Sequence, residues 1–422
     1  MKLNVIPAVA AAAVCATVLS ATAQAQSESE RIKALEAMIQ KQQAQIETQQ
    51  KLLEEMHTAL KSVQESGQGE GTGRNRVVLS RDDKVKLSIE GQVNRAMLYY
   101  NDGNKSAVRH VDNGASSTRL AFKGSAQATD DLSLGATIEV QFESNSTGTV
   151  NQADNTAVGT DSFTQRKLEI YASSERFGTI AMGQGDTATD GMSESDLSGT
   201  DLVGYAAVAD AGGGLSFATS RTGAITGNPT VGGVFDNLNG LGRDDRLLYE
   251  TPNFRGLTLA TSVIDGGEWD VAASYGASYD SLTVNAKLGY ANQSGTQTFP
   301  ETILGGSLAV LHKSGFNFAA GTGKGDDSDS TRDAQSFAYG KVGYIAQDLF
   351  RFGAAHFSVD YGRYDNAAAN NDEGTAMGFQ FVQSLDDFGT ELYAGYRRYE
   401  LDRPGSSFDD IDVVLAGARV KF

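Results

Sequence analysis

The chain has 422 residues, 48 of them glycine, and carries a formal net charge of −18. This acidic balance argues against nucleic acid as a partner, because binding to phosphates needs a basic surface. After the first 25 residues there is no apolar run long enough for a helix to span a bilayer. The composition therefore leaves either a large soluble β protein or a membrane β-barrel, whose strands give a weak hydrophobic signal because half of each strand is polar.

The N-terminus predicts an exported protein. Lys2 precedes an apolar run at 6–19, and the small residues that follow offer cleavage after Ala23 or Ala25. We interpret residues 1–25 as a signal peptide; the alternative, an anchor helix, would need about 20 apolar residues. The single cysteine, Cys15, lies in this segment, so we expect the mature chain to have no disulfide, no thiolate metal site and no cofactor.

Residues 27–65 predict an α-helical coiled coil. They are rich in Gln, Glu, Lys and Ala, and Gln42 and Gln49 fill two core positions of a heptad pattern. The apolar core positions, at a spacing of three and four, are Ile32, Leu35, Ile39, Ile46, Leu53, Met56 and Leu60. The alternative is one amphipathic helix lying on another surface. A Gly-rich linker, 66–83, separates this helix from the rest of the chain.

From Lys84 the hydrophobic period changes to two, which predicts an all-β body over 84–422. Sixteen segments can be counted, an even number, as a closed antiparallel transmembrane barrel requires. They are 84–100, 117–128, 132–143, 164–173, 178–185, 246–251, 256–264, 268–277, 282–292, 303–312, 316–323, 336–346, 356–364, 376–384, 391–401 and 411–422. A soluble β-sandwich would give the same alternation, but the signal peptide and the even count favour the barrel.

The connections and the last strand support the same interpretation. Long polar connections alternate with tight turns, as in a barrel with long extracellular loops and short periplasmic turns. In the last segment Val414, Ala416, Ala418, Val420 and Phe422 share one face, which we expect to meet lipid.

Three stretches resemble the general Gram-negative porin superfamily. They are Ser117-Thr118-Arg119-Leu120-Ala121-Phe122-Lys123-Gly124-Ser125, Phe177-Gly178-Thr179-Ile180-Ala181-Met182-Gly183 and Tyr249-Glu250-Thr251-Pro252-Asn253-Phe254-Arg255-Gly256. The resemblance implies a trimer of sixteen-stranded barrels in the outer membrane, in which the loop after the fifth strand folds into the lumen. It also implies that the barrel-assembly machinery reads the terminal Phe422. The helix at 27–65 resembles that of dicarboxylate-uptake porins, which carry a periplasmic helix ahead of the barrel.

The resemblance makes 186–245, the longest connection, the candidate constriction loop. Its carboxylates are Asp186, Asp190, Glu194, Asp196, Asp201 and Asp210. The basic wall facing it would carry Arg119, Lys123, Lys167 and Arg166, although the alternation leaves the direction of Arg166 open. An acidic loop opposite a basic wall would set a transverse field across the eyelet, and with the net charge it predicts a mild cation preference.

Three functions remain open from the sequence. The first is a passive diffusion channel for small hydrophilic solutes. The second is a substrate-selective channel, for example for small carboxylates, with Tyr393, Arg397 and Tyr399 as candidate contacts. The third is a tether that joins the outer membrane to peptidoglycan through the coiled coil. We expect lipopolysaccharide and other outer-membrane lipids as partners, and no enzyme activity, because the four histidines lie in no recognisable nucleophile or metal motif.

Overall fold

A computed structural model gives the structure of residues 77–82, 85–154, 163–293, 299–327 and 331–422. The chain divides into two units, 1–68 and 69–422, and the second contains every described residue. The predicted signal peptide and coiled coil lie outside the described residues, and so does the Gly-rich part of the predicted linker.

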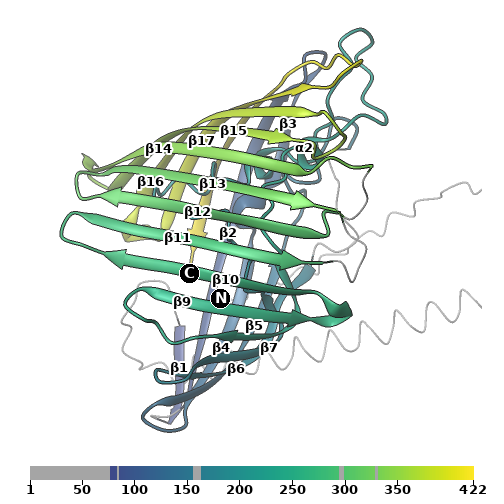
Figure 1. Ribbon diagram of the computed structural model, residues 1–422. Coiled ribbons are helices and arrows are strands. Elements are labelled where there is room, and N and C mark those ends of the chain that lie inside the picture. Colours follow the sequence, from purple (N-terminus) through teal and green to yellow (C-terminus); the bar gives the residue numbers. More distant parts are fainter. Residues whose placement is uncertain (1–76, 83–84, 155–162, 294–298, 328–330) are drawn as a thin grey trace, which may run out of the picture. The chain divides into compact units, whose positions relative to one another are not determined.

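Long antiparallel strands form the body of the protein (Figure 1). The sheet has 18 strands, and all except β1 and β3 form the barrel wall, which leaves sixteen. The wall strands are β2 (Val85–Asn101), β4 (Arg119–Gln127), β5 (Leu132–Phe142), β6 (Phe163–Ser174), β7 (Gly178–Asp186), β8 (Arg243–Glu250), β9 (Leu257–Ile264), β10 (Trp269–Ser278), β11 (Leu282–Asn292), β12 (Thr302–His312), β13 (Phe316–Asp326), β14 (Gln335–Phe350), β15 (Gly353–Asp365), β16 (Glu373–Leu385), β17 (Thr390–Asp402) and β18 (Ile411–Lys421).

The first and last wall strands close the barrel. β2 pairs with β4 along one edge and with β18 along the other, and every neighbouring pair of wall strands is antiparallel. The ladder between β18 and β2 runs from Asp412 opposite Asn101 to Lys421 opposite Gln92. The predicted closed barrel of sixteen antiparallel strands is therefore confirmed, with each predicted segment inside or within a few residues of an observed strand.

Two further strands were not predicted. β1 (Val77–Asp82) lies in the predicted linker and pairs with the start of β2, so the ordered sheet begins before Lys84. Its sequence, VVLSRD, opens with β-branched and apolar residues that favour a strand. β3 (Ser106–Asp112) lies in the connection after β2 and pairs with the C-terminal part of that strand, from Arg95 to Asn101.

The outer surface of the barrel is apolar. Leu134, Ile138 and Phe142 of β5 alternate with Thr137 and Glu139, and the three apolar side chains are exposed on the outer face. Exposed aromatic residues form two bands near the strand ends, where a membrane barrel places its interfacial girdles. At the ends joined by short turns these residues include Phe177, Phe254, Tyr279, Phe316, Phe352 and Phe388, and at the opposite ends Tyr99, Phe142, Phe163, Trp269 and Tyr361.

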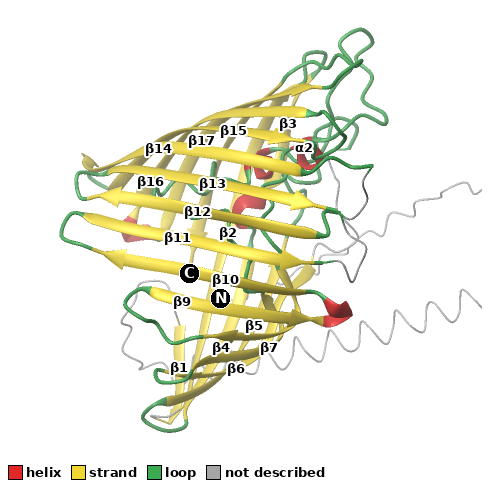
Figure 2. Ribbon diagram, viewed as in Figure 1, coloured by secondary structure: helices red, strands yellow, loops and turns green. Residues whose placement is uncertain are grey.

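Among the described residues, helical structure is limited to short turns (Figure 2). The α-helix α2 (Val231–Val234) and a 3₁₀ turn at Val208–Ala211 both lie in the connection between β7 and β8. Within the described ranges no helix is long and apolar enough to cross a membrane.

Candidate functional site

The connection between β7 and β8, residues 187–242, lies along the inner wall of the barrel, and we call it the lumen loop. Its first residues contact successive strands in order. The N–H of Ala188 donates to Oγ of Ser262 on β9 at 2.7 Å, and the carbonyl of Met192 accepts from Oγ of Ser307 on β12 at 2.8 Å. Inward-facing hydroxyl groups of the wall therefore satisfy backbone groups of the loop.

An ion pair holds the next part of the loop to β14. Nζ of Lys341 lies 2.7 Å from Oδ2 of Asp196 and donates to the carbonyl of Gly204 at 2.6 Å. The lysine side chain is 0% exposed and the aspartate side chain 8% exposed. On β15, Oγ of Ser358 lies 2.7 Å from Oγ1 of Thr200. Breaking a pair as buried as this one would leave a charge without a partner.

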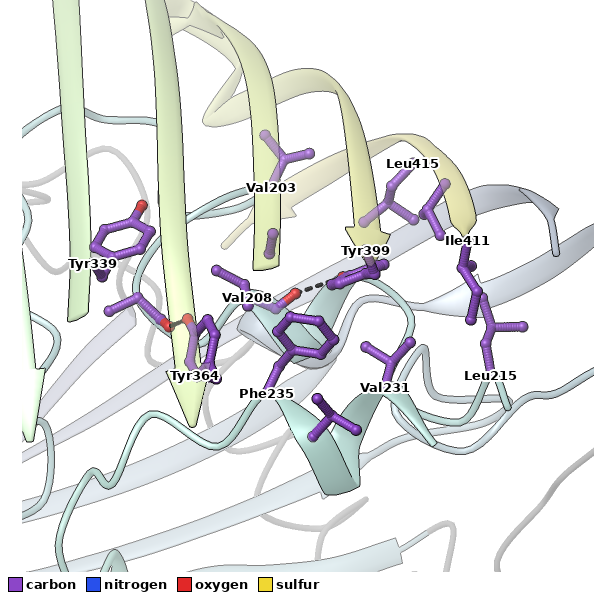
Figure 3. Close-up of a cluster of buried hydrophobic side chains, with 14 of the residues drawn as sticks. Val203, Val208, Leu215, Val231, Phe235, Tyr339, Tyr364, Tyr399, Ile411 and Leu415 are labelled. Atoms are coloured by element: carbon purple, nitrogen blue, oxygen red, sulfur yellow. Dashed lines mark hydrogen bonds between the residues drawn. The ribbon is translucent and has the colours of Figure 1, made fainter. Parts of the chain in front are cut away.

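Two tyrosines of the wall hold the middle of the loop (Figure 3). The Tyr364 hydroxyl on β15 donates to the carbonyl of Ala206 at 3.1 Å, and the Tyr399 hydroxyl on β17 donates to that of Val208 at 2.6 Å. Phe235, on the returning part of the loop, packs against both rings with centroids 5.1 and 5.0 Å away. Each tyrosine thus contributes a hydrogen bond and apolar area to the same contact.

Apolar residues of the loop and wall form a hydrophobic core inside the barrel. Figure 3 shows several of its side chains between the loop and strands β14 to β18. Its fully or nearly fully buried members include Leu98, Tyr100, Met192, Leu202, Val208, Leu215, Phe217, Val231, Val234, Phe235, Leu238, Tyr364, Tyr399, Ile411, Val413 and Leu415. The loop is therefore packed as part of the folded body and fills one side of the lumen.

Inward glycines on the wall let the loop approach the strand backbones. A Cβ on Gly321 of β13 would lie 2.6 Å from the carbonyl oxygen of Ser193, and a Cβ on Gly395 of β17 would lie 2.4 Å from the side chain of Val203. Any larger residue at Gly321 would push the loop backbone away from the wall, because the atom in contact is a backbone oxygen. Glycines at inward positions of wall strands are thus the sequence signal for a loop that lies close against the wall.

The six acidic residues of the predicted constriction have different surroundings. Asp186 forms ion pairs with Lys167 and, at 3.7 Å, with Nη1 of Arg243. Asp190 lies 3.8 Å from the same Arg243 nitrogen. Asp196 pairs with Lys341, as described above. Asp201 is the exposed member of the set.

The other two acids are half-buried within the loop. Burial raises the pKa of Glu194 to about 7, although the amide of Asn237 donates to its Oε1 at 2.8 Å. Burial likewise raises the pKa of Asp210 to about 6, and this carboxylate accepts from the Tyr205 hydroxyl. Most of the predicted acidic set therefore lies against basic partners or inside the packed loop, with Asp201 free to meet water.

A β-bulge fixes the direction of Arg166. Glu139 pairs with Lys167 and Val140 with Gln165, so Arg166 is the additional residue on β6. The bulge turns two adjacent residues toward the lumen. Arg166 bonds to Glu139 and donates from Nη1 to Oε1 of Gln141 at 2.9 Å, while Lys167 meets Asp186. Strict alternation could not place both side chains inside.

The remaining basic residues lie on β4. Lys123 pairs with Glu90 of β2 at 2.8 Å, and Arg119 forms no ion pair with any carboxylate among the described residues. Both line a hollow of about 340 Å³ on the uncovered side of the lumen. Its other polar wall residues are Glu90, Gln92, Glu139 and Lys421.

The comparison with protein families decides the identity. A family model described as Gram-negative porin matches residues 8–404. The chain belongs to the Gram-negative porin family. The porin is thus an outer-membrane channel rather than an enzyme. No curated protein matches its sequence.

Solved structures share the fold of this porin. An anion-selective porin from Comamonas acidovorans is similar with a TM-score of 0.53 and 14% identity, over 80% of this chain and 100% of that one. The trimer form of OmpT, an outer-membrane protein of Vibrio cholerae, gives a TM-score of 0.52 and 13% identity, over 81% of this chain and 100% of that one.

Three residues considered as solute contacts are buried in this porin. Tyr393, Arg397 and Tyr399 are at most 3% exposed. Arg397 donates from two nitrogens to Asp360, each at 2.8 Å, and Tyr399 holds the lumen loop. The suggestion that they touch a solute is therefore wrong, because the loop packs over them. No cluster of three potential metal ligands occurs in the described part of the porin.

Proposed function

We propose that this porin is a passive diffusion channel for small hydrophilic solutes and ions, with the lumen loop forming its constriction. The observation that carries the proposal is the continuous attachment of the loop to the inner wall, from Ser262 on β9 to Tyr399 on β17. A loop fixed in this way narrows the passage permanently and leaves the polar hollow on the β2–β4 side for water and solutes.

The charges of the passage support a finer proposal. The acidic set, Asp186, Asp190, Glu194, Asp196, Asp201 and Asp210, contributes less free negative charge than six carboxylates would, because Asp186, Asp190 and Asp196 have basic partners and Glu194 is partly protonated at neutral pH. On the opposite wall, Arg119 lies near Arg166, Arg243 and Arg419, with Glu139 as a neighbouring carboxylate, and it forms no ion pair among the described residues. This residue favours the second candidate function, a channel selective for small anions such as carboxylates, over the mild cation preference that the sequence predicted.

We further propose a homotrimer inserted with the short turns in the periplasm. The coiled coil predicted at 27–65 would lie on that side, where it could serve assembly or contact peptidoglycan. Phe422 would be the residue read by the barrel-assembly machinery. Support for the trimer comes from the structural similarity to the trimer form of OmpT.

Planar-bilayer recording of the purified full-length protein tests the channel proposal. We expect discrete, stable conductance steps, because the loop is fixed by buried contacts. Absence of steps would refute both channel proposals and leave the tether as the remaining function. Saturable block by one carboxylate, but not by a neutral solute of similar size, would support the selective channel.

A further inference from the structure

An arginine of the wall holds the point where the lumen loop leaves β7. The guanidinium of Arg246 on β8 donates from Nε to the carbonyl of Asp186 and from Nη1 to the carbonyl of Gly183, each at 2.8 Å. Its third nitrogen, Nη2, lies 2.5 Å from Oε2 of Glu169 on β6. One side chain therefore joins two carbonyl groups at the end of β7 to the neighbouring strand.

Two glycines make room for this ion pair. Glu169, Gly183 and Arg246 lie opposite one another in a row across β6, β7 and β8. Because Gly183 has no side chain, the two charged groups can meet across it. A Cβ on Gly185, two residues further along β7, would lie 2.4 Å from Oε2 of Glu169 and 2.7 Å from Nη2 of Arg246. The pair is thus enclosed by the wall, with the arginine side chain 3% exposed and the glutamate side chain 12% exposed.

The carbonyl that Arg246 holds belongs to an acid of the passage. The Asp186 side chain is 42% exposed, forms an ion pair with Lys167 and lies 3.7 Å from Nη1 of Arg243. Arg243 in turn lies near Arg119, the basic residue that faces the polar hollow. The position of the Asp186 carboxylate therefore determines how much of the positive charge of its two partners acts on passing ions.

We propose that Arg246 is a positioning residue for ion selectivity, which fixes the backbone of Asp186 and so keeps its carboxylate against its two basic partners. The proposal rests on the channel function proposed above. A guanidinium suits this role because its planar fork directs N–H donors to separate acceptors, whereas lysine carries all its donors on one nitrogen. Without the fork the start of the loop moves, the carboxylate leaves Lys167 and Arg243, and their charge attracts anions.

A purely structural role for the pair predicts a different result. Loss of a pair that only supports the fold would make the currents noisier or reduce the amount of inserted barrel. It would leave the reversal potential unchanged, because the charges that line the passage would keep their positions.

The test measures the reversal potential of the purified full-length protein in a KCl gradient across a planar bilayer. Arg246→Met/Glu169→Met removes the ion pair and leaves neither charge buried without a partner. Arg246→Lys retains the charge but loses the fork. We expect both variants to shift the reversal potential toward chloride, in the direction that Asp186→Asn gives. In an Asp186→Asn background neither should add a further shift, because the two cations then already lack that carboxylate.

Arg403→Met/Asp372→Asn is the matched control, because it removes an ion pair of 2.6 Å between the β15–β16 and β17–β18 connections. It should keep the wild-type reversal potential. A wild-type reversal potential in Arg246→Lys, even with noisier currents, would overturn the proposal, and so would shifts that add to that of Asp186→Asn. If Arg246→Met/Glu169→Met does not insert, the result with Arg246→Lys decides. Absence of conductance steps from the wild type would refute the channel proposal itself.

Discussion

Lys341 of β14 and Asp196 of the lumen loop form an ion pair of 2.7 Å in which the lysine side chain is shielded from water. The same ammonium also donates to the carbonyl of Gly204, eight residues further along the loop. One wall residue therefore holds two points of the loop. Substitution of Lys341 should therefore change the position of the loop more than it changes the net charge that lines the passage.

Replacing Lys341 by Met should loosen the loop. The variant leaves Asp196 buried without its partner, which typically costs about 3–5 kcal/mol. We expect larger and noisier single-channel currents and faster proteolysis within 187–242. Lys123→Met is the control, since it removes an equal charge from an exposed pair with Glu90. Quiet, wild-type currents from Lys341→Met would show that the other contacts fix the loop alone.

Replacing Arg119 by Gln should shift ion selectivity toward cations. Arg119 faces the hollow and forms no ion pair among the described residues, so its charge acts on passing ions although the nearby Glu139 offsets it in part. The reversal potential in a KCl gradient measures the shift. Asp201→Asn, at the exposed acid of the loop, should move it in the opposite direction. An unchanged reversal potential in Arg119→Gln would place the selective region elsewhere.

The packing of the loop should weaken as the pH rises. The folded pKa of Glu194 is about 7, above its usual 4.5, so the folded state binds more protons between these values and its stability falls as the pH rises through this window. The penalty above pH 7 is on the order of 3 kcal/mol. Open-channel noise should therefore be greater at pH 8 than at pH 5.

Glu194→Gln should abolish this pH dependence, because the amide is neutral throughout. Asp210, whose pKa is raised to about 6, would contribute a smaller part in the same direction. Noise that rises equally with pH in the wild type and in Glu194→Gln would exclude Glu194 as the cause.

Removal of Phe422 should impair insertion more than conduction. The backbone of Phe422 exchanges two hydrogen bonds with Gly91, at 2.8 and 2.9 Å, and its ring covers the position where a Gly91 side chain would stand. We expect several-fold less barrel in the membrane fraction and an unchanged conductance per inserted channel. A truncated protein that inserts at the wild-type level would argue against Phe422 as an assembly signal.

Deletion of 27–63 should weaken the trimer without closing the pore. The heptad positions Ile32, Ile39 and Ile46 predict an oligomeric helix, and the barrel does not depend on that segment for its closure. The mass of the detergent-solubilised protein and its dissociation temperature measure the effect. A deletion variant that stays trimeric and equally heat-resistant would argue against a role of the helix in assembly. Binding to peptidoglycan would then be its remaining proposed role.

The sequence by itself determined the barrel. Side chains on a strand between lipid and water must alternate, and that period is visible from Lys84 to Phe422 without any tertiary information. The alternation also predicted that the Lys123 side chain on β4 faces the lumen. The sequence also indicated that the long connection after Asp186 is the candidate constriction loop.

Only the tertiary structure decided how the loop lies and which charges are free. The pairs Asp196–Lys341 and Asp186–Lys167 join residues far apart in the chain, and no local pattern encodes such pairs. The bulge at Arg166 breaks the alternation on which the sequence analysis relied. Local periodicity indicates which face of a strand a residue occupies. Whether a charged side chain on that face acts on the water in the lumen depends on which other residues pack against it and pair with it.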